Sequence, residues 1–111
     1  PRLDKTFNEM RDLANKYNFD VTVIIAPTKV RLHGKYFNVV PESSESPHFI
    51  NYVENLSKST GFTVVNLHSL LQPYAGSSIL YFCDDDHWNE EGHRLAAKSV
   101  LQETFAHDMR L

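Results

Sequence analysis

The residues that could do chemistry gather in one short segment, Cys83–His93, which reads Cys-Asp-Asp-Asp-His-Trp-Asn-Glu-Glu-Gly-His. A histidine that acts as a general base needs one ring nitrogen free to accept a proton. It also needs a carboxylate on the other nitrogen, which fixes the tautomer and stabilises the imidazolium. Asp84 or Asp85 could reach back across a turn to Nδ1 of His87, whereas Asp86 is directly adjacent and less well placed. The spacing predicts a dyad of His87 with Asp85 or Asp84.

Two neighbours of this pair, Trp88 and Asn89, are expected to support the loop and to border the binding site. Asn89 suits the N-cap of a following helix, and Glu90 and Glu91 would place negative charge in its first turn, where the helix dipole favours it. We expect Trp88 to pack at the edge of the site rather than to act as a substrate platform. A solvated loop without a catalytic role would explain the helix-capping residues. It would not explain the whole Asp-His-Trp-Asn-Gly-His pattern.

The segment also contains two further groups of the kind that bind metals, Cys83 and His93. The spacing of the aspartates with His87 and His93 matches no compact zinc pattern, so we expect no metal and no cofactor. We expect Cys83 to be a small buried residue at a strand end, because no oxyanion site that would serve a cysteine nucleophile accompanies it.

A small basic strip lies earlier in the chain, where Lys29, Arg31, His33 and Lys35 alternate with other residues. This period of two predicts a short half-exposed strand or an extended loop. These cations either line a solvated edge or contact an anionic polysaccharide or another acidic partner. Neighbouring positive charges would attract such a partner. Lys29 and Arg31 are the predicted binding residues.

Hydrophobic periodicity predicts the elements that must position these groups. Apolar residues at helical spacing predict helices over residues 3–18, from about residue 49 to a glycine cap at Gly61, and from the Asn89 cap to about Ala106. Short apolar runs predict strands over 21–26 and 62–67, both buried on both faces, and a short third strand over 79–82. Residues 41–47 predict a polar loop.

Strands that alternate with helices predict an α/β fold with a parallel sheet. In such sheets ligands bind outside the carboxyl ends of the strands. The segments that follow the predicted strands, residues 27–35, 68–78 and 83–89, are therefore expected to hold the site.

Composition narrows the class of protein. The chain has 111 residues, which suits one domain. Its net charge of −3 disfavours a nucleic-acid binder, since such domains carry a basic excess. No apolar run reaches the roughly 20 residues that would span a membrane. Its one cysteine excludes an intrachain disulfide.

The motif as a whole resembles a known family. Asp85-Asp86-His87-Trp88-Asn89, followed after two further residues by Gly-His-Arg-Leu-Ala-Ala from Gly92, resembles the last block of the SGNH (GDSL-like) hydrolase superfamily. Its Asp-x-His-Trp form is similar to the branch with alginate O-acetyltransferase-like and DHHW-type proteins, whereas the commoner Asp-x-x-His spacing would select Asp84. The segment from Ile24 to Lys29, with Tyr36-Phe37 after it, resembles that branch's strand-Pro-x-Lys segment.

The resemblance implies a three-layer α/β/α fold with a parallel sheet, flavodoxin-like, of which this chain is expected to be the C-terminal portion. It implies a serine esterase or O-acyltransferase acting on an acylated carbohydrate or a similar ester. A serine would attack the ester, His87 would take its proton, Asp85 or Asp84 would orient the histidine, and a glycine and an asparagine would bind the oxyanion. The resemblance also favours a location in the periplasm or cell envelope.

The chain departs from the family pattern in one important respect. The Gly-Asp-Ser and Gly-x-Asn-Asp blocks are absent, and Ser99, the only serine after His87, falls inside a predicted helix. In the alginate branch the serine can follow the histidine, but in most of the superfamily both blocks precede this segment. We therefore expect the rest of the hydrolase domain upstream of Pro1 and an inactive isolated chain. The alternatives are a non-catalytic α/β binding or interaction module and a metal-dependent hydrolase that uses the acidic cluster.

Overall fold

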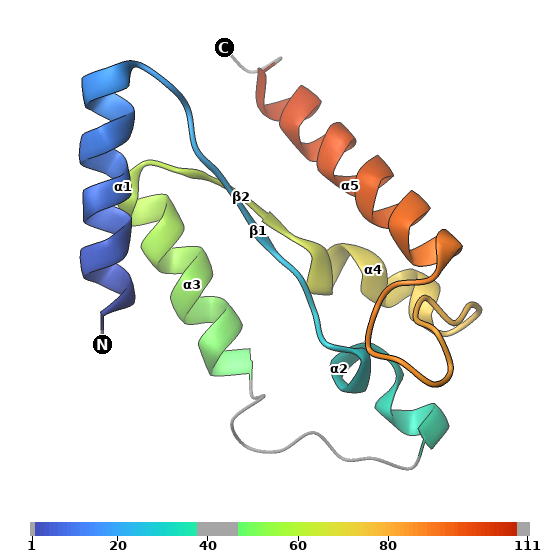
Figure 1. The fold of residues 1–111 in the computed structure, drawn as a ribbon. Coiled ribbons are helices and arrows are strands. Elements are labelled where there is room, and N and C mark those ends of the chain that lie inside the picture. Colours follow the sequence, from blue (N-terminus) through green and yellow to red (C-terminus); the bar gives the residue numbers. More distant parts are fainter. Residues whose placement is uncertain (1, 38–46, 109–111) are drawn as a thin grey trace.

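The computed structural model describes residues 2–37 and 47–108, so most of the predicted polar loop at 41–47 lies outside the described residues (Figure 1). In chain order the elements are α1 (Leu3–Tyr17), β1 (Thr22–Ile25), α2 (Lys29–His33), a 3-10 turn (Gly34–Phe37), α3 (Pro47–Thr60), β2 (Thr63–Asn66), α4 (Leu67–Ala75) and α5 (Glu90–Asp108). The three long helices and the two strands confirm the predicted order. None of the described helices is long and apolar enough to cross a membrane.

The sheet of the described residues consists of β1 and β2, which pair in parallel. Thr22 lies opposite Thr63 and Ile25 lies opposite Asn66, with α3 in the crossover between the strands. Both strands therefore end at the same edge, where α2, α4 and the loop before α5 gather (Figure 1). The predicted parallel sheet is confirmed.

Helices cover both faces of this sheet. Successive side chains of β2 point to opposite faces, so Val64 and Val65 separate two cores. On the face of Val64, α1 and α3 close a cluster formed by Phe7, Ile25, Ile50, Val53 and Phe62. On the face of Val65, α4, α5 and the chain between them close a second cluster formed by Val65, Leu67, Leu71, Leu80, Tyr81, Leu95 and Ala96. The result is an α/β/α arrangement of three layers.

The prediction that β1 is buried on both faces is wrong. Ile24 is 48% exposed, although Val65 beside it in the register is 1% exposed. The reason is that α5 packs against β2 and leaves the same face of β1 open.

The basic strip does not form a strand or an extended loop. It forms α2 and the 3-10 turn, and the helix begins because the Thr28 side chain accepts a hydrogen bond from the Arg31 N–H at 3.3 Å. The inward side of this helix buries His33 completely, so His33 does not lie on a solvated edge. Alternating charges over so few residues mimicked the period of a strand.

The third predicted strand also differs from the structure. Of residues 79–82 only Tyr81 pairs, in an antiparallel bridge with Trp88, and none joins the sheet. The helix α4, in contrast, was not predicted. Leu67, Leu71 and Ala75 are buried at spacings of four, and Asn66 caps the helix by accepting from the Ser69 N–H at 3.2 Å.

Candidate active site

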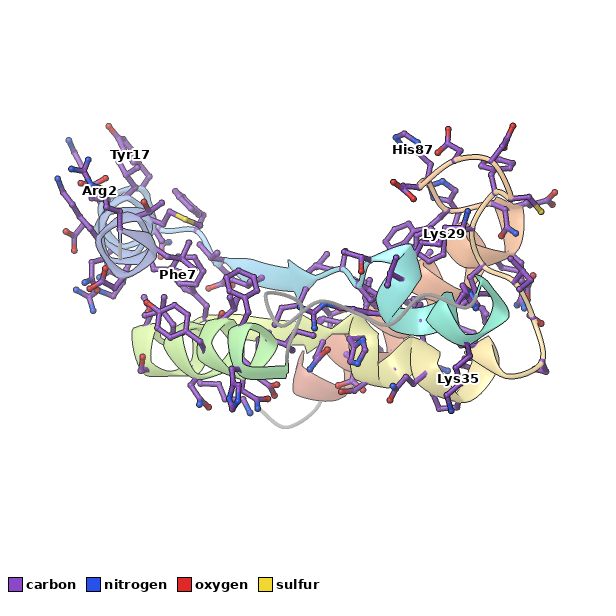
Figure 2. All side chains as sticks on the ribbon, turned by 90° about the horizontal axis from the view of Figure 1, so that it is seen from below. Arg2, Phe7, Tyr17, Lys29, Lys35 and His87 are labelled. Atoms are coloured by element: carbon purple, nitrogen blue, oxygen red, sulfur yellow. The ribbon has the colours of Figure 1, made fainter. Side chains whose placement is uncertain are left out.

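The predicted site lies on a loop whose two ends are joined by backbone hydrogen bonds. The N–H of Phe82 donates to the carbonyl of His87 at 3.0 Å, and the N–H of Asn89 donates to the carbonyl of Leu80 at 2.9 Å. These bonds flank the bridge between Tyr81 and Trp88 and tie the two ends of the loop together. Figure 2 shows His87 at the outer side of this loop, with Lys29 beneath it.

Asp85 and His87 form the pair that the spacing predicted. Nδ1 of His87 is hydrogen-bonded to Oδ1 of Asp85, and the same oxygen accepts the backbone N–H of His87 at 2.6 Å. The backbone N–H of His87, followed by its ring, holds the pKa of Asp85 below its ordinary value. A carboxylate that stays ionised is what an orienting partner of a histidine base requires.

The far side of the imidazole faces solvent, because the His87 side chain is 85% exposed. Its second ring nitrogen is therefore accessible to a reacting group. Asp84 and Asp86 are also exposed, and neither has a hydrogen bond to His87 in the described structure. Of the two spacings left open by the sequence, the geometry brings together the one with Asp85.

Asn89 supports this loop from below. Its side-chain oxygen accepts the N–H of Gly92 at 2.9 Å, which caps α5, and its amide donates to the carbonyls of Ile79 and Tyr81 at 2.8 and 3.3 Å. Trp88 is half-buried against the second core, and its ring meets that of His93 edge-on at 5.6 Å between centroids. Asn89 and Trp88 are thus both placed to support the loop that carries His87.

The region around α2 attaches to the loop segment at three points. Nε2 of the buried His33 accepts the N–H of Leu80 at 3.1 Å, and the Tyr81 hydroxyl donates to the carbonyl of Pro27. The Lys29 ammonium donates to the carbonyls of Phe82, Cys83 and Asp85. Because these groups are separated by 47 to 56 positions, sequence reasoning did not find them.

Burial, followed by the charge of Lys29, lowers the pKa of His33. A lowered pKa favours the neutral ring, and only a neutral ring can accept the Leu80 N–H through Nε2.

A comparison with protein-family models matches residues 2–108 to the SGNH hydrolase-like domain of the acetyltransferase AlgX. The chain belongs to this family. The suspected SGNH branch is thereby confirmed, and so is an α/β fold for the chain. Comparison with curated proteins and with solved structures gave no match.

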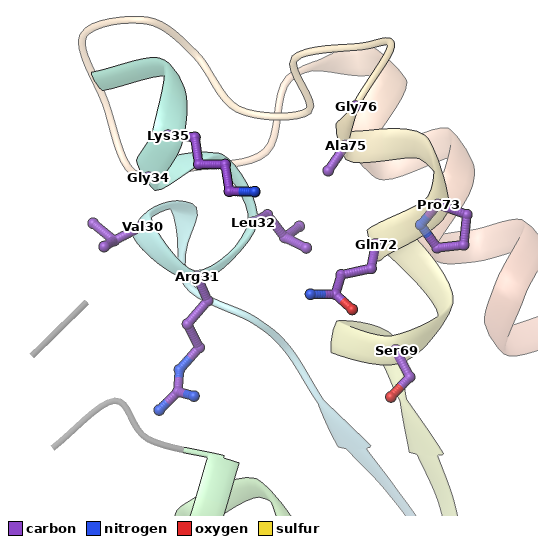
Figure 3. A pocket seen from close by; sticks show the side chains of 10 residues that line it. All are labelled: Val30, Arg31, Leu32, Gly34, Lys35, Ser69, Gln72, Pro73, Ala75 and Gly76. Atoms are coloured by element: carbon purple, nitrogen blue, oxygen red, sulfur yellow. The ribbon is translucent and has the colours of Figure 1, made fainter. Parts of the chain in front are cut away.

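In this AlgX-like domain, Arg31 and Lys29 lie against different parts of the structure. Arg31 lines a pocket of 670 Å³ between α2 and α4, together with polar residues that include Lys35, Ser69 and Gln72 (Figure 3). Lys29 instead donates to the loop carbonyls. The residues of the basic strip therefore do not share one binding surface.

The prediction for Cys83 is wrong, because the thiol is exposed rather than buried. The chain at Cys83 belongs to the projecting loop, since the predicted strand before it does not enter the sheet. Among the described residues of the domain, no three His, Cys, Asp or Glu side chains gather in a way that could hold a metal ion.

Proposed function

We propose that this chain supplies the base and its orienting carboxylate to a serine-dependent acyl-transfer site that acts on an acylated carbohydrate or a similar ester. The observation that carries the proposal is the hydrogen bond that Nδ1 of His87 donates to the Asp85 carboxylate, in a ring that is otherwise open to solvent. Membership of a hydrolase-like acetyltransferase family supports the reaction class.

In the proposed mechanism Nε2 of His87 accepts the hydroxyl proton of a serine as its oxygen bonds to the ester carbonyl carbon. Asp85 stays ionised and stabilises the imidazolium. His87 then gives the proton to the departing alkoxide, which leaves an acyl-serine. A water molecule or an acceptor hydroxyl then loses its proton to His87 as its oxygen bonds to the acyl carbon. The bond between the acyl carbon and the serine oxygen breaks, and His87 returns the proton to that oxygen, so the reaction is hydrolysis or transfer.

The serine in this proposal comes from a part of the hydrolase domain outside residues 1–111. Within the described structure, Ser99 lies inside α5 and is 9% exposed, which does not suit a nucleophile. Ser77 and Ser78 follow the C-terminus of α4, where their N–H groups donate to the Tyr74 carbonyl.

The test is made on the gene product that contains this chain, with p-nitrophenyl acetate and an acetylated oligosaccharide as substrates. We expect His87→Ala and Asp85→Asn to lower kcat by on the order of 10³- to 10⁴-fold, as loss of the base or of its orienting carboxylate does in other triads. Asp84→Asn should stay within about threefold of the parent if Asp85 is the partner.

Two results would contradict the proposal. Activity that survives His87→Ala would show that another base works. A gene product without a Gly-Asp-Ser segment and without ester turnover would favour the non-catalytic binding module.

A further inference from the structure

We infer that Lys29 is a positioning residue, whose ammonium group holds the Asp85–His87 loop in its productive shape by binding three loop carbonyls. The catalytic consequence of this inference rests on the proposed function, whereas its structural part does not. It assigns Lys29 a role distinct from the contact with an anionic partner that its charge predicted.

The contacts of Lys29 use its donors fully. Nζ donates to the carbonyls of Phe82, Cys83 and Asp85 at 2.7, 3.0 and 3.1 Å. An ammonium group has three N–H donors and no acceptor, so three carbonyls match its capacity. Hydrogen bonds from a charged donor are stronger than neutral ones. A single side chain thus binds the loop from Phe82 to Asp85.

The third carbonyl links Lys29 to the dyad. The Asp85 backbone carbonyl accepts a hydrogen bond from Lys29, and the Asp85 carboxylate accepts from the backbone N–H and the ring of His87. Fixing the carbonyl restricts the backbone of Asp85, and this restriction limits where the carboxylate can lie. The Lys29 charge also contributes, as the smallest of several causes, to the lowered pKa of Asp85.

Lys29 is itself held at a defined place. It is the first residue of α2, which Thr28 caps three positions after the end of β1 at Ile25. The Tyr81 hydroxyl binds the Pro27 carbonyl two positions earlier, so the base of the loop and the start of α2 are already joined. Loosening the Lys29 side chain should therefore free the outer part of the loop and leave its base in place.

The first test uses the 111-residue chain and needs no variant. We expect the Lys29 ammonium protons to exchange slowly with water and to show scalar couplings through hydrogen bonds to the carbonyl carbons of Phe82, Cys83 and Asp85 in NMR spectra. Ammonium protons that exchange as fast as those of exposed lysines, with no such couplings, would overturn the inference.

The second test compares Lys29→Met, which keeps the length but not the charge, with Lys29→Arg and with Lys98→Met as a matched control on exposed α5 surface. In Lys29→Met we expect about tenfold or faster exchange of the His87 amide, whose N–H is bound by the Asp85 carboxylate, since the charge-assisted bonds that hold Asp85 are lost. The pKa of Asp85 should move up towards its ordinary value. Lys29→Arg should retain part of the protection and Lys98→Met all of it. Unchanged loop exchange in a folded Lys29→Met chain would contradict the inference.

The third test separates positioning from substrate contact, in the gene product that contains the chain. If Lys29 positions the dyad, Lys29→Met lowers kcat by about 10- to 100-fold with little change in KM, and does so even for uncharged p-nitrophenyl acetate. If Lys29 contacts an anionic substrate, KM rises for that substrate alone. A parent with no ester turnover would refute the proposed function but leave the first two tests standing.

Discussion

His87 takes its orientation from a single carboxylate two positions earlier, and that carboxylate is held in turn by the backbone of His87 itself. Such a local arrangement requires little from the remainder of the fold. Its position in space, however, depends on distant residues, because Lys29, His33 and Asn89 bind the carbonyls and N–H groups of the same segment.

Gly92 is the residue at which a single methyl group should do most harm. A Cβ atom there would meet the carbonyl oxygen of Leu80 well inside van der Waals contact and would also press on Trp88. We expect Gly92→Ala to lower the free energy of unfolding by about 1–3 kcal/mol, as overpacking does. Urea denaturation measures this change. Gly76→Ala is the control, because a Cβ at Gly76 meets nothing within 4 Å, and an equal loss in both variants would contradict the prediction.

His33 should make the stability of the fold depend on pH. Its pKa is lowered by burial and then by Lys29, so between that lowered value and 6.5 the unfolded chain binds a proton that the folded chain does not. The free energy of unfolding should fall as the pH drops through this window, by at most about 1.4 kcal/mol per pH unit for each such histidine. His68 contributes in the same direction, through burial and then Arg31.

Urea denaturation across this pH range, with His33→Gln as the test variant, measures the contribution of His33. Glutamine can still accept the Leu80 N–H but does not titrate. The slope should become shallower in His33→Gln and shallower again when His68→Gln is added. Identical slopes in the parent and in His33→Gln would show that His33 does not cause the dependence.

Among the elements, the long helices could be predicted because each shows several repeats of the helical period, and the two strands because each is a short apolar, β-branched run. The five-residue α2 is too short to show a helical period, and its alternating charges imitate a strand. The segment Ile79–Phe82 is apolar enough for a strand, yet its backbone groups bind His33, Asn89 and the far side of the loop instead of the sheet. Sequence alone does not reveal such partners.

The start of α5 should couple helix stability to loop geometry through Asn89. Its oxygen caps the helix at the Gly92 N–H, while its amide binds the carbonyls of Ile79 and Tyr81. We expect Asn89→Ala to lower the free energy of unfolding by about 1–3 kcal/mol, since the cap and two partners are lost together. Asn89→Ser keeps a cap and should lose less.

Thermal and urea denaturation compare the two variants, and amide exchange at Leu80 and Tyr81 reports on the loop. Faster exchange is expected in both variants, because serine does not replace the amide donor. Equal stability of Asn89→Ala and the parent would contradict a coupling role.

In the molecule as a whole, the sheet is covered unevenly. On one side α3 contacts both strands, whereas on the other side Ile24 remains 48% exposed beside the buried Val65. The alternation of strands and helices predicted the parallel sheet, and the family resemblance implied the three layers. The sequence could not predict the open face, because an apolar β-branched run looks the same whether one or two faces are covered.

The whole molecule also determines what the isolated chain can do. The dyad provides a base and its orienting carboxylate, but a base alone does not form the covalent intermediate that acyl transfer requires. Ser99 is buried in α5, and Ser77 and Ser78 lie beside the end of α4, where their N–H groups bind the Tyr74 carbonyl. We therefore expect the 111-residue chain to hydrolyse p-nitrophenyl acetate no faster than its His87→Ala variant, apart from the slow reaction of any exposed histidine. Turnover by the isolated chain that His87→Ala abolishes would mean that a nucleophile lies within these residues. The exposed thiol of Cys83, four positions from His87, would then be the first to replace with serine.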